Sequence, residues 1–148
     1  MAHLRRTLKN FSMNTQASKA ISIRQPWANL IQIGEKTIET RTWSTEYRGD
    51  LIICSSKKPD ENVRLDINRI RSDGAIWTFD PETGHADYLF FGYALCKVEL
   101  YDVVKMTEKH EALACCLVYP GAFAWLLRNV RPVKPFKVAG KLRLFEIA

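Results

Sequence analysis

Residues 21–59 read ISIRQPWANLIQIGEKTIETRTWSTEYRGDLIICSSKKP, and the rest of the 148-residue chain is predicted to pack around them. The β-branched run at 21–24 predicts a strand. Pro26 follows, where its fixed φ and missing N–H suit the first turn of a helix, and Gly34 stands where a left-handed C-terminal cap is expected. These signals predict a short helix over residues 26–33.

The threonine-rich segment 36–43 predicts a second strand, because β-branched residues favour extended backbone. The alternation of side chains along a strand places Thr37, Glu39, Arg41 and Trp43 on one face. A buried charge without a partner is strongly destabilising. We therefore expect Glu39 and Arg41 to pair or to face a ligand, and to matter more for ligand binding than for stability.

A set of polar, aromatic, aliphatic, proline and glycine positions runs through this stretch: Ser22, Gln25, Pro26, Trp27, Ala28, Gly34, Lys36, Glu39, Arg41, Trp43, Thr45, Arg48, Gly49, Leu51, Ile53, Lys57, Lys58 and Pro59. This set resembles the ASCH domain, the activating signal cointegrator homology region, which belongs to the PUA-like group of small β-barrels. The resemblance weakens after residue 59 and returns at 123–135 and 140–146. It implies a cleft between the first helix and the 36–43 strand, proposed in the family to bind RNA or a nucleobase.

Period-two runs and turn signals extend the prediction to the rest of the chain. We expect an α+β fold: a single mixed β-barrel of the PUA-like type with flanking short helices and the 36–43 strand at its centre. Residues 1–18 are predicted to form a flexible N-terminal arm, and residues 19–148 the ASCH (PUA-like) domain. Further helices are expected near 60–72 and 107–117, a loop over 75–88, and further strands at 51–54, 88–104, 122–130 and 142–147.

The chain carries 22 Lys and Arg against 16 Asp and Glu, which gives a net charge of +6 and a pI near 9.3. This balance suits a polyanionic partner, although runs of charge are also typical of solvated faces. Both interpretations apply to the basic residues that crowd the two ends of the sequence: Arg5, Arg6, Lys9, Arg128, Arg131, Lys134, Lys137, Lys141 and Arg143.

The four cysteines do not have the spacing of a zinc site, and the three histidines are isolated. Cys54 and Cys96 fall in apolar strands and are predicted to be buried thiols. We expect no metal or cofactor. The chain has no signal-peptide pattern and no apolar run near the ~18 residues needed to cross a bilayer, so we expect a cytoplasmic monomer without membrane contact.

The predicted ligand is RNA or a nucleoside-like molecule. The start of the first helix offers N–H groups and the positive end of its dipole to an anion. Trp27 and Trp43 either stack on a base or belong to the core. Arg41 either clasps a phosphate or pairs with a carboxylate, and Arg48 either shapes a turn or faces the ligand. The predicted ligand-binding residues are Gln25, Pro26, Trp27, Lys36, Glu39, Arg41, Trp43 and Arg48.

Two other classes of function remain open. A branch of ASCH-like proteins deacylates acylated cytidine with a Lys, a Thr and a Glu, and others are linked to RNA cleavage; the resemblance makes Lys36 and Glu39 the candidate catalytic residues. Lys36, Thr37 and Ile38 match the first three positions of this branch's Lys-Thr-x-Thr segment, but Glu39 stands in the position of the nucleophilic Thr. Alternation along the strand is expected to point Thr37 and Thr40 away from that position. In the remaining class, a protein-interaction module, Glu39 and Arg41 brace the barrel.

Overall fold

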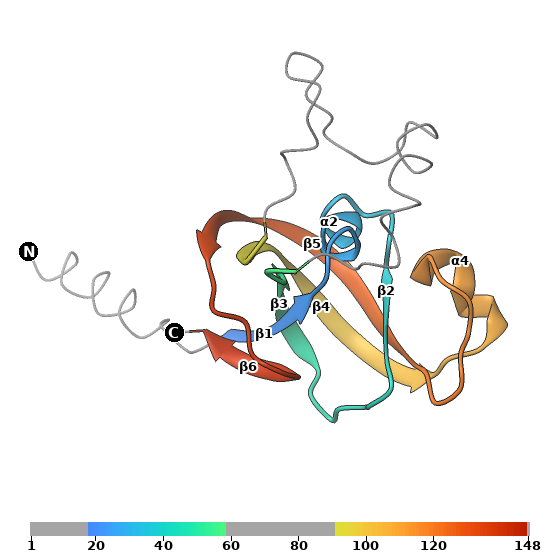
Figure 1. Cartoon of the computed structure of the whole chain (residues 1–148). Coiled ribbons are helices and arrows are strands. Elements are labelled where there is room, and N and C mark those ends of the chain that lie inside the picture. The colour runs from blue at the N-terminus through green and yellow to red at the C-terminus, as the bar shows by residue number, and fades with distance from the viewer. Residues whose placement is uncertain (1–17, 59–90, 148) are drawn as a thin grey trace, which may run out of the picture.

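The computed structural model describes residues 18–58 and 91–147, which form a six-stranded mixed sheet with short helices packed on it (Figure 1). The predicted helix at 60–72 and loop at 75–88 lie outside the described residues. So does the predicted N-terminal arm, except for Ser18, which begins the first strand. The elements in chain order are β1 (Ser18–Ile23), α2 (Trp27–Gln32), β2 (Ile38–Arg41), β3 (Gly49–Ser55), β4 (Tyr93–Lys105), the 3₁₀ helix η2 (Glu108–His110), α4 (Glu111–Ala114), β5 (Phe123–Lys137) and β6 (Leu144–Ile147).

The strand order is β2-β5-β4-β3-β1-β6, and β1 and β3 are parallel while the other neighbours are antiparallel. The edge strands β2 and β6 do not pair with each other in the described part of the chain. A barrel closes only when its two edges join, so the prediction of a barrel was wrong. Both edge strands are four residues long, which leaves little ladder with which to close the sheet.

Strand β2 lies at the edge of the sheet, so the prediction that it is central was also wrong. It pairs with β5 alone, from Ile38 opposite Leu126 to Arg41 opposite Phe123. The preceding residues take other partners: the Lys36 N–H donates to Leu30 O and the Thr37 N–H to Leu113 O, both at 3.0 Å. These bonds anchor the start of β2 to both helical segments instead of to a second strand.

Strand β5 is longer than the predicted 122–130, because it continues through Pro132 and Pro135 to Lys137. Proline lacks the N–H of a ladder bond and is tolerated where one side of a strand is open. Strand β2 pairs with β5 only at residues 123–126, so the later part of β5 has such an open side in the described structure.

The predicted helix at 26–33 is confirmed as α2, and Gly34 follows it with φ +84° as expected of a left-handed cap. The helix predicted at 107–117 is shorter and begins with the 3₁₀ turn η2. Cys115 follows α4 with φ +58°, and this left-handed conformation ends the helix. A capping box joins Thr107 and His110 at the start of η2, and the Thr107 N–H donates to His110 Nδ1 at 2.9 Å.

The main core lies between α2 and the sheet and is centred on Trp125, which is fully buried. Its indole N–H donates to Trp43 O at 3.3 Å, and the two rings meet edge to face with centroids 4.8 Å apart. Edge-to-face packing is favourable for aromatic pairs, so Trp43 holds the β2–β3 connection on the core. The other buried members of this core are Ile21, Ile23, Ala28, Ile31, Leu51, Ile53, Leu95, Cys96, Val98, Leu100 and Leu127.

Cys54 and Cys96 are buried as predicted, and burial raises the pKa of each thiol to about 12. Cys115 and Cys116 are half-buried. Thiolate is the reactive form, so at pH 8 we expect an aromatic disulfide reagent to modify Cys115 and Cys116 in the folded protein. Cys54 and Cys96 should react only after unfolding in denaturant. Rapid reaction of all four thiols in the native protein, counted by absorbance, would contradict this core.

Candidate functional site

The topology brings four distant segments together at one end of the sheet. Strands β1 and β3 are parallel, so both end there, and antiparallel pairing makes β4 begin and β5 end at the same place. Three backbone bonds join these ends: Ser56 N–H to Ile23 O at 2.9 Å, Gly92 N–H to Ser55 O at 3.0 Å, and Val138 N–H to Gly92 O at 2.9 Å.

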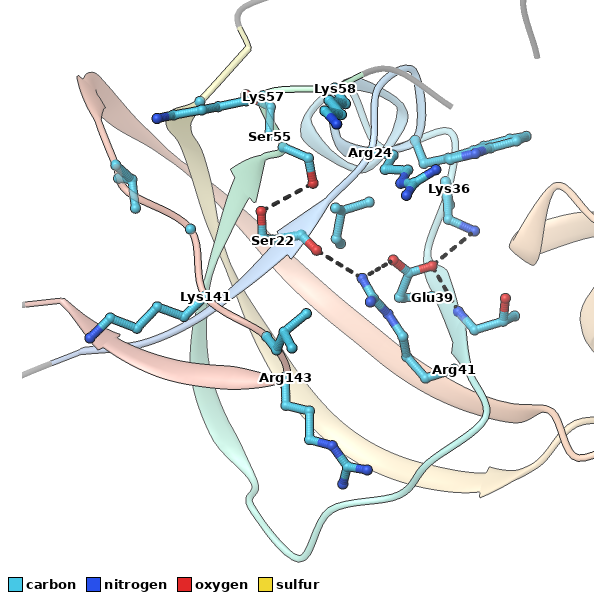
Figure 2. A pocket seen from close by; sticks show the side chains of 18 of the residues that line it. Ser22, Arg24, Lys36, Glu39, Arg41, Ser55, Lys57, Lys58, Lys141 and Arg143 are labelled. Carbon is cyan, nitrogen blue, oxygen red and sulfur yellow. Dashed lines mark hydrogen bonds and ion pairs between the residues drawn. The ribbon is translucent and has the colours of Figure 1, made fainter. Parts of the chain in front are cut away.

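A cleft of about 940 Å³ opens at this end, and β2 forms its far wall. Figure 2 shows Lys36, Glu39 and Arg41 meeting on one side of the cleft, while Lys57, Lys58, Lys141 and Arg143 surround it. The lining contains seven basic residues and one acidic residue among those that the structure describes: Arg24, Lys36, Arg41, Lys57, Lys58, Lys141 and Arg143, against Glu39.

Glu39 organises the floor of the cleft. Glu39 is 7% exposed, and its Oε1 accepts the Thr40 N–H at 2.8 Å. Oε2 accepts from the Arg41 guanidinium at 3.2 Å, and the Lys36 Nζ lies 3.8 Å from Oε1. Two cations and a backbone N–H compensate this buried carboxylate, as a buried charge requires.

Lys36 and Arg41 are held by further internal partners. Lys36 is 3% exposed, donates to the carbonyl of Ala114 at the end of α4, and lies 5.5 Å from the ring centre of Trp27. Arg41 donates to Ser22 O at 3.0 Å. The three charged side chains therefore connect β2 with β1 and α4, and neither cation has its full charge available to a ligand.

The basic residues at the rim are different. Arg24, Lys57, Lys58, Lys141 and Arg143 form no ion pair within residues 18–58 and 91–147, although Arg143 lies 5.1 Å from the ring centre of Trp43. These five residues are not among the ligand-binding residues predicted from the sequence. Each lies just beyond the end of a strand or just before the start of one, and that position is the signal that would have identified them once the strand order was known.

Four of the eight predicted ligand-binding residues line the cleft, namely Trp27, Lys36, Glu39 and Arg41. Gln25 and Pro26 do not. Gln25 is 1% exposed, and its Oε1 accepts the Asn29 N–H at 2.9 Å. The Trp27 N–H is taken by Arg24 O. The Trp27 and Asn29 N–H groups, which the predicted anion site would use, are therefore donated within the chain.

Trp43 and Arg48 also lie outside the cleft lining. Trp43 packs on Trp125. Arg48 shapes the turn before β3, donating to Thr45 O at 2.7 Å and to Tyr47 O at 2.9 Å. Thr40 lines the cleft and Thr37 does not, and the Thr40 hydroxyl lies 3.8 Å from Cys116 Sγ on the α4 side of β2. The cleft borders β2 on both the β1 side and the α4 side, through Ser22 and Cys116, and therefore receives side chains from both faces of the strand.

The basic run at the C-terminal end divides into two groups. Arg128 pairs with Glu99 at 2.6 Å and stacks on Tyr101, and Arg131 pairs with Asp50 at 2.6 Å. The hydrogen bond from Arg131 lowers the pKa of the Asp50 carboxyl. Arg128 therefore links β5 to its neighbour β4, and Arg131 links β5 to β3 on the other side of β4, whereas Lys141 and Arg143 reach the cleft.

Within residues 18–58 and 91–147, no cluster of three His, Cys, Asp or Glu side chains is arranged to hold a metal ion. No helix in the same part of the chain has the length and apolar character needed to span a bilayer.

The fold and the cleft define a protein of the ASCH class. The family model for the ASCH domain matches residues 21–137, most of the chain, and the chain belongs to this family. Among curated proteins, a 40-residue segment is 48% identical to human activating signal cointegrator 1. This segment is 26% of the present chain and 7% of the human protein, so the likeness covers a small part of that relative.

Solved structures with the same fold include ASCH from Zymomonas mobilis, with a TM-score of 0.53 and 14% identity over 88% of this chain and 87% of that one. A point mutant of the Zymomonas protein gives a TM-score of 0.52 and 13% identity over 90% of this chain and 91% of the other. At this identity the likeness shows the fold.

The buried ion pair of Lys36 and Glu39 predicts a large effect on stability, whereas the sequence led us to expect that Glu39 matters more for ligand binding. Glu39→Gln should lower the free energy of unfolding by about 3–5 kcal/mol, because it leaves Lys36 buried beside a neutral side chain. The variant Lys36→Met/Glu39→Gln should recover much of this loss, since the buried Lys36 charge is then absent and the partly exposed Arg41 keeps its bond to Ser22 O. Urea melts of the wild type, both single variants and the double variant measure the coupling. Additive losses would show that the two charges do not interact.

Proposed function

We propose that this ASCH domain is an RNA-binding module that holds an unpaired base or strand end in its cleft. The observation that carries the proposal is the charge of an open cleft of about 940 Å³, which seven basic residues and one acidic residue line. Counterion release makes such a surface favourable for a nucleic-acid backbone. The ASCH family is associated with RNA binding, which agrees with this proposal.

The five rim cations suit phosphate contacts, because no carboxylate in the described structure competes for them. Glu39 on the floor suits the base: each carboxylate oxygen has two acceptor positions, so Glu39 can also accept from an exocyclic amine. Trp27 lines the cleft as a half-buried aromatic surface. Sequence-specific recognition of RNA commonly combines such contacts on unstacked bases.

Lys57→Ala/Lys58→Ala is predicted to weaken binding of a single-stranded RNA octamer. It should also reduce the slope of log K against log salt by about 1.4, which corresponds to two phosphate contacts on a single strand. Fluorescence anisotropy at salt concentrations from about 50 to 300 mM measures both the affinity and the slope. Both side chains are exposed, so the fold should be unaffected.

The matched control is Lys105→Ala/Lys109→Ala, which removes the same charge at two exposed lysines outside the cleft. This variant should bind like the wild type. If both double variants weaken RNA binding equally, the effect comes from general surface charge and not from the cleft. If the octamer does not bind the wild type, the proposal is overturned.

A second candidate is hydrolysis of a modified nucleoside such as N4-acetylcytidine. The observation that favours it is a lysine and a glutamate 3.8 Å apart on the floor of the cleft, with Thr40 beside them. In this reaction water adds across the N4–acyl bond and yields cytidine and acetate. Thr40 is then the available hydroxyl, since Glu39 stands where the related enzymes have their nucleophile.

This candidate predicts acetate release from N4-acetylcytidine that Thr40→Val abolishes. Thr40→Val keeps the shape of the side chain, whereas Lys36→Ala also breaks the buried pair and requires a melt beside the assay. Chromatographic detection of cytidine decides between the two candidates. A wild-type protein that binds RNA and forms no cytidine supports the binding module alone.

A further inference from the structure

A second hollow joins the cleft at the end of β5. Its volume is about 410 Å³, and four of its lining residues also line the cleft, so the two hollows adjoin each other. The shared residues are Lys57, Gly92, Val138 and Ala139, and the hollow adds Phe91, Tyr93 and Lys137. We refer to it as the side groove.

The side groove combines aromatic and basic side chains. Phe91 is 39% exposed although it is a large apolar residue. Tyr93 lies directly opposite Lys137 in the β4–β5 ladder, which puts the two on one face of the sheet. Lys57 borders both hollows, and no described acidic residue lines the side groove. An aromatic surface beside phosphate-binding cations is how proteins hold single strands without sequence preference.

Gly92 lies at the boundary between the two hollows. It has φ +77°, which other residues rarely adopt, and a Cβ at this position would lie 3.2 Å from the Lys57 side chain. A larger residue would therefore press on the lysine that both hollows share. On the cleft side, Gly140 makes a similar close approach, because a Cβ there would lie 2.8 Å from Ser22 Oγ.

We propose that the cleft and the side groove form one track for single-stranded RNA. One base occupies the cleft near Glu39, the chain passes Lys57, and an adjacent base stacks on Phe91 with its phosphate near Lys137. The inference rests on the proposed function and adds to it that the ligand is an oligonucleotide, not a free nucleoside or mononucleotide.

Oligoadenylates of one to six nucleotides, titrated into the intact protein by calorimetry, test this track. Affinity should rise at least about fivefold between the mononucleotide and the trimer, because a stacked base contributes on that scale, and then level off. Phe91→Ala should remove this gain for the hexamer and leave mononucleotide binding unchanged, and Phe91→Tyr should restore it. Lys137→Ala should reduce the salt slope of hexamer binding by about 0.7.

The chain supplies matched controls for both side chains. Phe136 is 41% exposed and lines neither hollow, so Phe136→Ala removes an equally exposed ring from the neighbouring strand. Lys134→Ala removes an exposed lysine of β5 that also lies outside both hollows. Neither control should change hexamer affinity relative to the mononucleotide.

The possible failures are distinguishable. A mononucleotide that binds as tightly as the hexamer, or Phe91→Ala binding the hexamer like the wild type, overturns the track and leaves the proposed function intact. No binding of any oligoadenylate or of mixed-sequence RNA overturns both.

Discussion

The rest of the site depends on the charge compensation of the buried Glu39 carboxylate. It lies at the edge strand β2 and is compensated by Lys36, Arg41 and the Thr40 N–H. Lys36 in turn binds the carbonyl that ends α4, and Arg41 binds a carbonyl of β1. A strand of four residues that pairs on one side has few ladder bonds, so these charged contacts fix its position between the two neighbouring elements. Leaving any one of these charges unpaired would be destabilising, so the contacts favour this one arrangement.

This use of Lys36 and Arg41 separates the floor of the cleft from its rim. The floor cations neutralise Glu39 and satisfy carbonyl groups, so a bound anion gains little from them. The rim cations form no ion pair among the described residues, and they give the cleft its positive field. They are Arg24, Lys57, Lys58, Lys141 and Arg143. A polar acceptor at the bottom and a basic rim suit a ligand with a base at one end and phosphates at the other. A flat interface for a protein partner would not require a cleft with this distribution of charge.

The parallel pairing of β1 with β3 has the largest effect on where those cations lie. If the two strands were antiparallel, Arg24 and the Lys57–Lys58 pair would stand at opposite ends of the sheet. Instead both strand ends meet, and β4 and β5 bring Gly92 and the 138–143 segment to the same place. The glycines at 92 and 140 let the backbone approach the side chains of Lys57 and Ser22 closely at this end of the sheet.

The sequence by itself determined the family, the helix at 26–33 with its glycine cap, most strand positions, the buried Cys54 and Cys96, and the proximity of Lys36, Glu39 and Arg41. The family follows from the resemblance at residues 21–59, and the other features follow from local periodicity, turn chemistry and short spacing along the chain. Tertiary structure decided that the sheet stays open, that β2 is an edge strand, that Gln25 caps α2 and Trp43 supports Trp125, and that five distant cations form the rim. Strand order and side-chain partners depend on contacts between residues far apart in sequence, and a local pattern carries no information about which of those contacts form.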